Sequence, residues 1–283
     1  MAFIDRLQTI QFNGTELVSI LKSAQEFDYK RAGRWMDDHV VFALQMVAVY
    51  LTVIFALKER MRNRAPYDLR MPLATWNFLI ANLSGLSALA MVYQLATTTY
   101  NEGMNATICR TQDELYGGRM GYAMFCLLLA RLPEFIDTFF IVLRKQPLLF
   151  IHWYHHACTL VVGWFTYSTA FPAAAHVLFI NANIHTAMYS YYYVTALGMR
   201  PPGFVAKTIT FWQVVQFVLA FYGMCYVFWF HYILEMPCRI TTQTFCALLA
   251  MIASYLYLFT DFFVTKYTGR TVPQHKQLLK KAK

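Results

Sequence analysis

Seven long apolar stretches constrain what this chain can fold into more than any other feature. Each is close to the ~20 residues that a helix needs to cross the hydrocarbon core of a bilayer. Of the 283 residues, 58% are hydrophobic and only 14% are charged, which is too few charges for the surface of a soluble domain of this length. We therefore expect an all-α polytopic membrane protein with seven transmembrane helices, at residues 40–57, 72–97, 120–143, 147–168, 172–197, 204–230 and 245–265.

The charges outside these stretches predict the orientation of the chain. Residues 1–38 are polar and contain no cleavable signal peptide, so the first stretch must itself direct insertion. Lys and Arg are concentrated in alternate loops and after residue 265, which places the N-terminus in the lumen and the C-terminus in the cytosol. The net charge of +9 therefore reflects topology, and no nucleic-acid partner is expected. The expected segments are a luminal tail (1–38), a seven-helix domain (39–267) and a cytosolic basic tail (268–283).

Three features of the loops and tail agree with an endoplasmic reticulum membrane protein. The chain ends Lys280-Lys281-Ala282-Lys283, which looks like a dilysine retrieval signal, although a plain basic tail is the alternative. Asn105 begins a sequon in a non-cytosolic loop, where it is either a glycosylation site or a chance match. Cys109 and Cys238 are the only cysteines in the expected luminal loops, and they could form a disulfide in that oxidising compartment.

Ionisable residues inside spans are costly and are candidates for function. The third stretch carries Arg131, Glu134, Asp137 and Thr138, which share one arc of a helix at ~100° per residue. They are expected to face the protein interior. The alternative is that Arg131 and Glu134 simply pair to hold helices together, and both can be true.

The fourth stretch contains three histidines within five residues. His152, His155 and His156 have i, i+3, i+4 spacing, which places all three imidazoles on one face of a helix. A lone histidine on an apolar helix is usually a hydrogen-bonded core residue, but three together at membrane depth are a poor choice for packing alone. This box is the strongest indication of a catalytic site in the sequence.

The fifth and sixth stretches each carry a polar strip. Around His185 the spacing predicts one polar and aromatic face, whereas His176 falls on the opposite face and is expected to be structural or interfacial. Thr210, Gln213 and Gln216 follow at three-residue steps, with hydrogen bonding between helices as the alternative explanation. The face around His185 consists of Asn181, His185, Met188, Tyr189 and Tyr192.

In this order and spacing the motifs resemble the very-long-chain fatty acid elongase family, whose members are 3-ketoacyl-CoA synthases. One departure is Arg131 where the family usually has Lys, which would change the geometry of a phosphate contact. Trp153 within the histidine box is similar to the residue in family members that act on saturated and monounsaturated acyl chains. The matching motifs are Arg131-x-x-Glu134-x-x-Asp137-Thr138, Leu143-Arg144-Lys145, His152-x-x-His155-His156, Asn181-x-x-x-His185-x-x-Met188-Tyr189-x-Tyr191-Tyr192 and Thr210-x-x-Gln213-x-x-Gln216.

The resemblance implies a fold and a reaction. Helices two to seven would form an inverted barrel around an acyl tunnel, with the first helix outside and CoA entering from the cytosol. The reaction would condense malonyl-CoA with long-chain acyl-CoA, with no metal and no cofactor. Because the chain has no nicotinamide-binding glycine motif, a 3-ketoacyl-CoA reductase, a dehydratase and an enoyl-CoA reductase would complete the cycle. A homodimer or heterodimer is left open.

The resemblance also assigns roles to residues. It points to an acyl-imidazole intermediate on His155, with His152, His156 and His185 orienting groups, moving protons or stabilising charge. Asn181 and Gln213 would be uncharged donors, and Cys158 is the alternative nucleophile. CoA phosphates would meet basic residues on the cytosolic face, unless these residues serve topology alone; the candidates are Arg131, Arg144, Lys145, Lys207, Lys266 and Arg270.

Two other classes of protein are alternatives. A diiron membrane desaturase also has H-x-x-H-H boxes, but it needs about eight histidine ligands, and only four of the eight histidines here fall in the expected site. A seven-helix receptor or channel would leave the intramembrane carboxylates and histidines unexplained. Stoichiometric iron would favour the first alternative, and absence of turnover with acyl-CoA and malonyl-CoA would favour the second.

Overall fold

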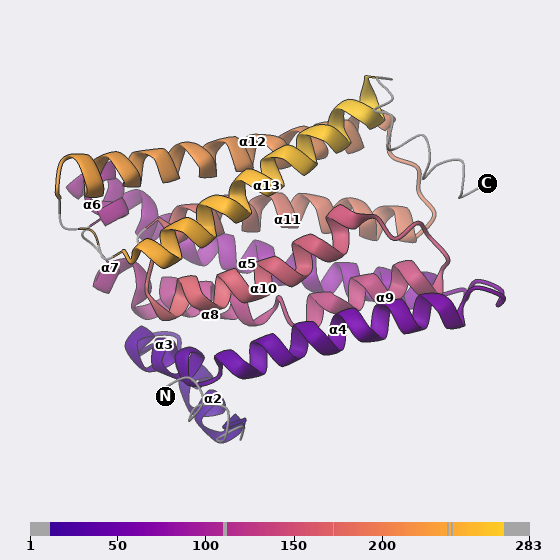
Figure 1. Ribbon diagram of the computed structural model, residues 1–283, viewed down its shortest axis with the longest axis horizontal. Helices are drawn as coiled ribbons and strands as arrows, with labels where there is room; N and C mark the ends of the chain where they lie inside the picture. Colours follow the sequence, from indigo (N-terminus) through magenta and orange to yellow (C-terminus); the bar gives the residue numbers. More distant parts are fainter. Residues whose placement is uncertain (1–11, 110–111, 172, 237, 239, 269–283) are drawn as a thin grey trace.

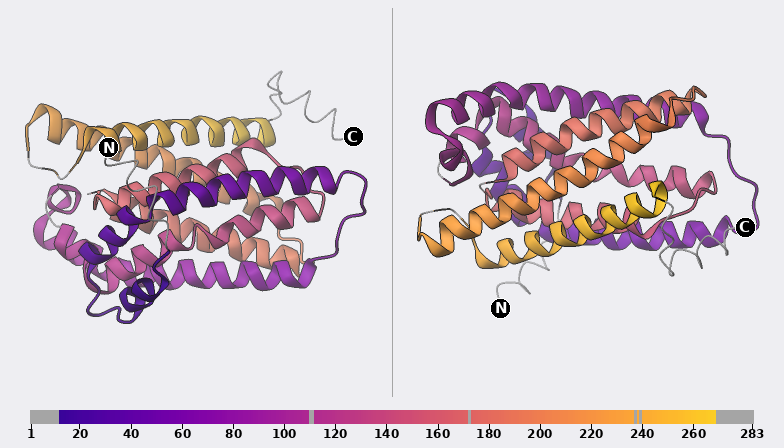
Figure 2. Two further views of the ribbon diagram at one scale, coloured as in Figure 1. Left: turned by 60° about the horizontal axis from the view of Figure 1, so that its bottom comes forward. Right: turned by 90° about the horizontal axis from the view of Figure 1, so that it is seen from above.

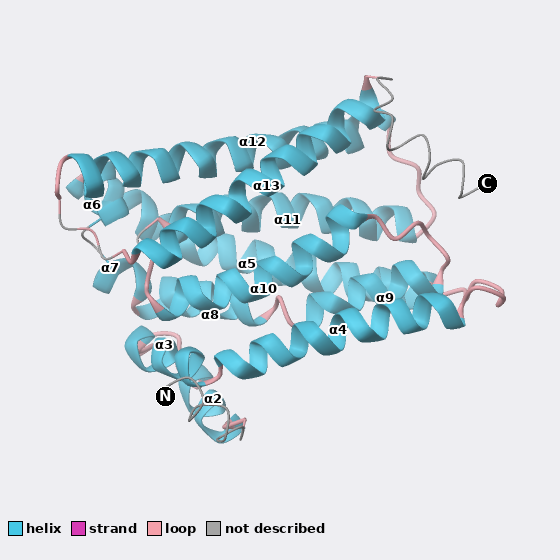
Figure 3. Cartoon of the chain, viewed as in Figure 1, coloured by secondary structure: helices cyan, strands magenta, loops and turns pink. Residues whose placement is uncertain are grey.

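The computed structural model describes residues 12–109, 112–171, 173–236, 238 and 240–268, and every regular element in these ranges is a helix (Figures 1 and 3). Four helices are long and apolar enough to cross a membrane. They are α4 (Val40–Arg60), α5 (Arg70–Glu102), α12 (Gly203–Phe228) continued by a π-helical turn η2 (Trp229–Ile233), and α13 (Thr242–Tyr267). The chain is thus a multi-pass membrane protein.

The other three predicted stretches are also helical, but they do not meet this measure of length and composition. The fourth and fifth stretches correspond to α10 (Phe150–Ser168) and α11 (Ala174–Ala196), which carry the histidines and the Asn and Tyr residues of the motifs. These polar side chains lower the hydropathy of both helices. The same residues that indicate function therefore weaken the membrane signal.

The third stretch is not the single helix expected at 120–143. It consists of α8 (Gly118–Leu129), a short 3-10 turn η1 (Pro133–Phe135) and α9 (Ile136–Leu143). Pro133 explains the break, because proline has no backbone N–H and its ring clashes with the preceding turn of an α-helix. The break moves Arg131 and Glu134 out of the regular α-helical spacing that the sequence suggested.

Residues 1–38 were expected to form a polar luminal tail, yet the described part of this segment packs onto the bundle. It forms α2 (Gly14–Leu21) and α3 (Tyr29–Asp38), and Asp28 caps α3 by accepting hydrogen bonds from Lys30 and Arg31 N–H. Trp35 and Met36 on α3 are fully buried, and Trp164 Nε1 donates to the Met36 carbonyl at 2.5 Å. Helices α2 and α3 are therefore part of the folded unit.

The long helices pack in a closed sequence of neighbours. Helix α5 packs against α11, α11 against α12, α12 against α13, α13 against α10, α10 against α8, and α8 against α5. Helix α4 packs against α9 and α10 (Figures 1 and 2). Helix α5 and helices α8 to α13 therefore surround an interior, into which their polar residues can point.

The two ends of the bundle are held differently. At one end, α6 (Met104–Cys109) and α7 (Gln112–Tyr116) follow α5, and a disulfide joins Cys109 to Cys238 before α13 (Figure 1). At the other end, Arg70 donates to the carbonyls of Ala196 and Leu197. Lys145 Nζ there donates to the Arg62 and Arg64 carbonyls at 3.1 and 3.0 Å. These contacts fix the loops around the opening of the site described next.

Candidate active site

Two cavities of different character meet inside the bundle. The first, called here the polar cavity, has a volume of about 510 Å³ and is lined by all four candidate catalytic histidines. The second, called the apolar cavity, has a volume of about 520 Å³ and extends toward α6. His155 and Gln216 line both, so the two volumes adjoin at these side chains.

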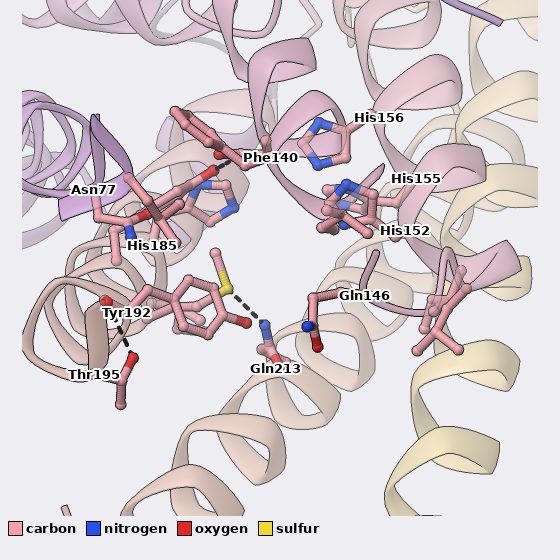
Figure 4. A pocket seen from close by; sticks show the side chains of 18 of the residues that line it. Asn77, Phe140, Gln146, His152, His155, His156, His185, Tyr192, Thr195 and Gln213 are labelled. Carbon is pink, nitrogen blue, oxygen red and sulfur yellow. Dashed lines mark hydrogen bonds between the residues drawn. The ribbon is translucent and has the colours of Figure 1, made fainter. Parts of the chain in front are cut away.

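The histidines come from two facing helices. Figure 4 shows His152, His155 and His156 on α10 at one side of the polar cavity and His185 on α11 at the other. The i, i+3, i+4 spacing produces this arrangement directly, because one face of α10 carries the whole box. His152 and His156 lie ring to ring, with centroids 4.5 Å apart.

A chain of hydroxyl groups holds His152. Thr138 Oγ1 on α9 lies 2.9 Å from His152 Nε2, and Tyr50 OH on α4 lies 2.8 Å from the same Thr138 oxygen. These hydrogen bonds fix the plane of the imidazole. Helix α4 therefore contributes to the site from outside the ring of helices.

His155 is positioned by α13. Its ring packs on Tyr255 with centroids 4.9 Å apart, and Tyr255 OH donates to the His155 carbonyl at 3.0 Å. The ring of Phe259 is a second aromatic neighbour, with its centroid 6.1 Å from that of the His155 ring. The aromatic surroundings leave the imidazole facing both cavities in a largely apolar setting.

The break between α8 and α9 presents a buried ion pair. Arg131 Nη1 donates to Glu134 Oε2 at 2.8 Å, and both residues are at most 4% exposed. Arg131 Nη2 donates to Asn181 Oδ1 at 2.9 Å, and Asn181 Nδ2 donates to Gln216 Oε1 at 3.4 Å. Glu134 Oε1 also lies 3.9 Å from His185 Nδ1. The predicted structural pairing is present, and it is joined to the predicted polar strips of α11 and α12.

A second carboxylate is held by two aromatic donors. Asp137 accepts from Trp76 Nε1 on α5 and from Tyr189 OH on α11, each at 2.5 Å. Asp137 and Tyr189 both line the polar cavity. The carboxylate thus ties three helices together beside the histidines.

The sequence comparisons agree with these motifs. The profile of the ELO family, described as GNS1/SUR4, matches residues 35–275. This chain is a member of the ELO family. Long chain fatty acid elongase 1 of Caenorhabditis elegans is 32% identical over 268 residues, which are 94% of this chain and 93% of the relative. Very long chain fatty acid elongase 6 of Homo sapiens is 32% identical over 253 residues, covering 87% and 92%. Very long chain fatty acid elongase 3 of Mus musculus is 32% identical over 237 residues, covering 82% and 85%.

Three more of the predicted site residues of this ELO protein meet at the polar cavity. Met188, Tyr192 and Gln213 line it, and Gln213 Nε2 lies 3.2 Å from the Met188 sulfur (Figure 4). Within the described residues, no group of three or more His, Cys, Asp and Glu side chains could hold a metal ion. Cys158, the alternative nucleophile, is half-buried and lines neither cavity.

The five basic candidates for CoA that the structure describes do not gather in one place. Arg144 lines the polar cavity, and Lys145 lies beside it but is engaged with loop carbonyls. Lys207 and Lys266 are exposed and line neither cavity. Arg131 is buried at the helix break, pairs with Glu134 and lines the apolar cavity, so a contact with CoA stays a prediction. Arg270 lies outside the described residues, as does the dilysine tail.

His176 differs in part from its expected position. Its Nε2 lies 3.3 Å from Thr107 Oγ1 on α6, which is a structural contact as predicted. It nevertheless lines the apolar cavity, more than two helical turns from His185. The angular position of His176 on its helix did not predict this contact with the cavity, because the apolar cavity lies further along the bundle than the polar one. Asn105, the possible glycosylation site, is exposed on α6.

Several residues of the site escaped the sequence analysis. Asn77 lines the polar cavity, Trp76 binds Asp137, and Tyr50 and Tyr255 hold members of the histidine box through Thr138 and a backbone carbonyl. A signal existed for Asn77, because an amide within an apolar helix is a candidate for function. No signal distinguished the aromatic residues from the many others that pack.

Proposed function

We propose that this ELO protein condenses malonyl-CoA with a long-chain acyl-CoA, giving 3-ketoacyl-CoA, CO2 and CoA, through an acyl group carried on His155. The observation that carries the proposal is the position of His155 between the two cavities. An acyl chain in the apolar cavity would have its thioester carbon at His155, and the CoA part would extend through the polar cavity past Arg144. The fatty acid elongases among the relatives support the same reaction class.

The first half-reaction forms the intermediate. A lone pair of the His155 imidazole attacks the thioester carbon, the C–S bond breaks, and CoA leaves as the thiolate and takes up a proton. Gln213 and Asn181 are amide donors near this region that would stabilise the oxyanion. In the second half-reaction malonyl-CoA loses CO2, and its α-carbon attacks the acyl carbon while the C–N bond to His155 breaks.

The membrane arrangement follows the ring of neighbouring helices. In the proposal α8 with α9, α10 and α11 also cross the bilayer, which gives seven spans, and α5 with α8 to α13 form the inverted barrel with α4 outside. The end bearing Arg144 and Lys145 faces the cytosol, and the end bearing the Cys109–Cys238 disulfide faces the lumen of the endoplasmic reticulum. The products pass to a separate reductase, dehydratase and enoyl reductase. Trp153 supports a preference for saturated and monounsaturated chains.

Incubation of the purified protein with acyl-CoA alone tests the mechanism. It should release free CoA and add one acyl group to the intact mass, and malonyl-CoA should then discharge the adduct. His155→Ala should abolish both events. Gln213→Ala should slow the reaction by about 10- to 1000-fold, the usual range for loss of such a donor. His231→Ala, at a histidine that lines neither cavity, is the matched control and should retain acylation.

One result would replace this mechanism. If no adduct forms and CoA appears only after malonyl-CoA is added, the condensation takes place directly in a ternary complex. The four histidines would then be general acids, bases and charge stabilisers. A protein without any turnover on this substrate pair, across a ladder of acyl lengths, would contradict the proposed function itself.

A further inference from the structure

Asn77 presents a buried donor to the polar cavity. It lies on α5, one residue after Trp76, and it is 2% exposed. Its side chain lines the polar cavity, and its Nδ2 has no hydrogen-bond partner among the residues that the structure describes. Leaving a buried amide donor unpaired costs free energy, so a native protein retains such a group where a ligand or water can pair with it.

Two other asparagines, Asn82 on α5 and Asn183 on α11, satisfy their donors within their own helices. Asn82 Nδ2, further along α5, donates to the Phe78 carbonyl four residues earlier at 2.7 Å. Asn183 Nδ2 on α11 donates in the same way to the Phe179 carbonyl at 2.8 Å. This bond to the preceding turn is available to an asparagine on a helix. Asn77 does not make it, and its donor is left for a group within the cavity.

Neighbouring polar groups of the cavity are already engaged with the protein. Asp137 accepts from Trp76 and Tyr189, His152 bonds Thr138, and Gln213 lies against the Met188 sulfur. Even so, none of their acceptor atoms in the described residues lies within hydrogen-bond distance of Asn77 Nδ2. An acceptor oxygen brought in by a substrate can occupy that position.

The position of Asn77 indicates which substrate supplies that oxygen. Figure 4 shows Asn77 on the same side of the cavity as His185 and Tyr192, across from the histidines of α10. Asn77 does not line the apolar cavity, where the acyl chain lies in the proposed reaction. An acyl group bound to His155 therefore leaves the Asn77 side of the polar cavity to the second substrate.

We infer that Asn77 Nδ2 donates a hydrogen bond to the thioester oxygen of malonyl-CoA and stabilises the enolate that forms on decarboxylation. The bond between the α-carbon and the carboxylate breaks, CO2 leaves, and the electron pair moves toward the thioester oxygen. That enolate attacks the acyl carbon, and its electrons return to form the new C–C bond as the bond to His155 breaks. This inference rests on the proposed function and adds a donor for its second half-reaction.

The uncharged amide suits the thioester oxygen better than the malonyl carboxylate. A strong bond to the carboxylate would stabilise the ground state and oppose loss of CO2, whereas a donor at the thioester oxygen gains strength as charge develops there. A neutral donor that is already buried needs no reorganisation when the charge appears. Asn77 thus contributes to the transition state more than to substrate binding.

Single-turnover kinetics of Asn77→Leu test the inference, with Asn82→Leu as the matched control on the same helix. With acyl-CoA alone, Asn77→Leu should release CoA and acquire the acyl adduct at a rate within about twofold of the unaltered protein. Discharge of the adduct by malonyl-CoA should slow by about 10- to 1000-fold. Asn82→Leu should be normal in both halves. Acylation at the normal rate also demonstrates that the variant is folded, and Asn77→Ala replaces it if leucine disturbs the packing of α5 on α11.

The outcomes separate this inference from the proposed function. Normal discharge by a folded Asn77 variant overturns the role of Asn77 and leaves the proposed function intact. Equal slowing of both halves also overturns it, because the donor would then serve the thioester of either substrate. If the unaltered protein condenses its substrates without an acyl adduct, the two half-reactions cannot be timed separately. The test is then a comparison of steady-state kcat and KM between Asn77→Leu and the unaltered protein. A fall in kcat without a rise in KM for acyl-CoA, together with slower CO2 release, supports the inference, and an unchanged kcat refutes it.

Discussion

Arg131 and Asn181 are joined by a hydrogen bond of 2.9 Å from Nη2 to Oδ1, which links the break between α8 and α9 to the middle of α11. The other fork of the guanidinium pairs with Glu134 at 2.8 Å. A planar guanidinium can make both contacts at once, whereas an ammonium is a point charge on a flexible stem. Arginine at this position therefore has a structural reason.

Replacing Arg131 by methionine should strongly destabilise the protein. It would leave Glu134 as an unpaired charge in the interior, and breaking a buried pair in this way costs about 3–5 kcal/mol. Thermal unfolding in detergent should show a clear fall in Tm, part of which Arg131→Met with Glu134→Gln should recover. Arg62→Met removes the exposed pair with Glu59 and should leave Tm unchanged. Equal shifts for the buried and exposed pairs would contradict this account.

Thr138→Val should lower kcat with little effect on KM. Valine has nearly the shape of threonine but cannot bond either His152 or Tyr50, so the imidazole loses its fixed orientation. A misoriented catalytic group costs about 10-fold or more in rate. Thr186→Val is the matched control, because Thr186 Oγ1 bonds the Ala182 carbonyl in its own helix. Normal turnover by Thr138→Val would show that the hydroxyl chain does not position His152.

The disulfide between Cys109 and Cys238 should contribute substantially to stability. Loss of a native disulfide typically costs about 2–5 kcal/mol, and this one holds α6 against the start of α13. Cys109→Ser and Cys238→Ser should each lower Tm by a similar amount, and the double variant should add little. Cys225→Ser and Cys246→Ser, at exposed free thiols, should have no effect. Peptide mass spectrometry of the unreduced protein should recover the linked pair, and two free thiols would refute it.

Local spacing explains which parts of the site could be predicted from the sequence. The box of His152, His155 and His156 depends only on helical geometry within five residues, and the structure places its members on one face as expected. The face around His185 follows the same rule. Both helices continue regularly through their motifs, so the spacing along the chain becomes spacing in space.

Contacts between helices could not be predicted in this way. Trp76 reaches Asp137 across 61 residues of sequence, and Tyr50 reaches Thr138 across 88. Nothing in the spacing distinguishes these aromatic residues from others that only pack. Pro133 was visible in the sequence, but an unbroken helix was expected there, and the break is what turns Arg131 toward Asn181. The sequence did not predict the packing of α3, because its many charged residues are typical of a solvated tail. Its apolar residues Trp35 and Met36 are nevertheless buried.

Gly223 provides a test of whether the apolar cavity sets the length of the product. It lines that cavity on α12, seven residues beyond Gln216, which is about 10 Å along the helix. A Cβ built at Gly223 meets no atom within 4 Å, so there is room for a larger side chain. Gly223→Leu should therefore fill part of the cavity rather than distort the backbone.

The products of Gly223→Leu should be shorter than those of the unaltered protein, with little change in rate for short acyl-CoA substrates. Burial of each CH2 contributes only about 0.8 kcal/mol, so affinity alone would give a gradual preference, whereas a steric block gives a sharp limit. Gas chromatography of the products across a ladder of acyl lengths measures the shift. Gly203→Leu is the control, because Gly203 also has open space around its Cβ but lies at the exposed start of α12. An unchanged distribution of product lengths for Gly223→Leu would mean that the acyl chain lies outside the apolar cavity, because a leucine side chain inside an occupied tunnel must displace part of the acyl chain.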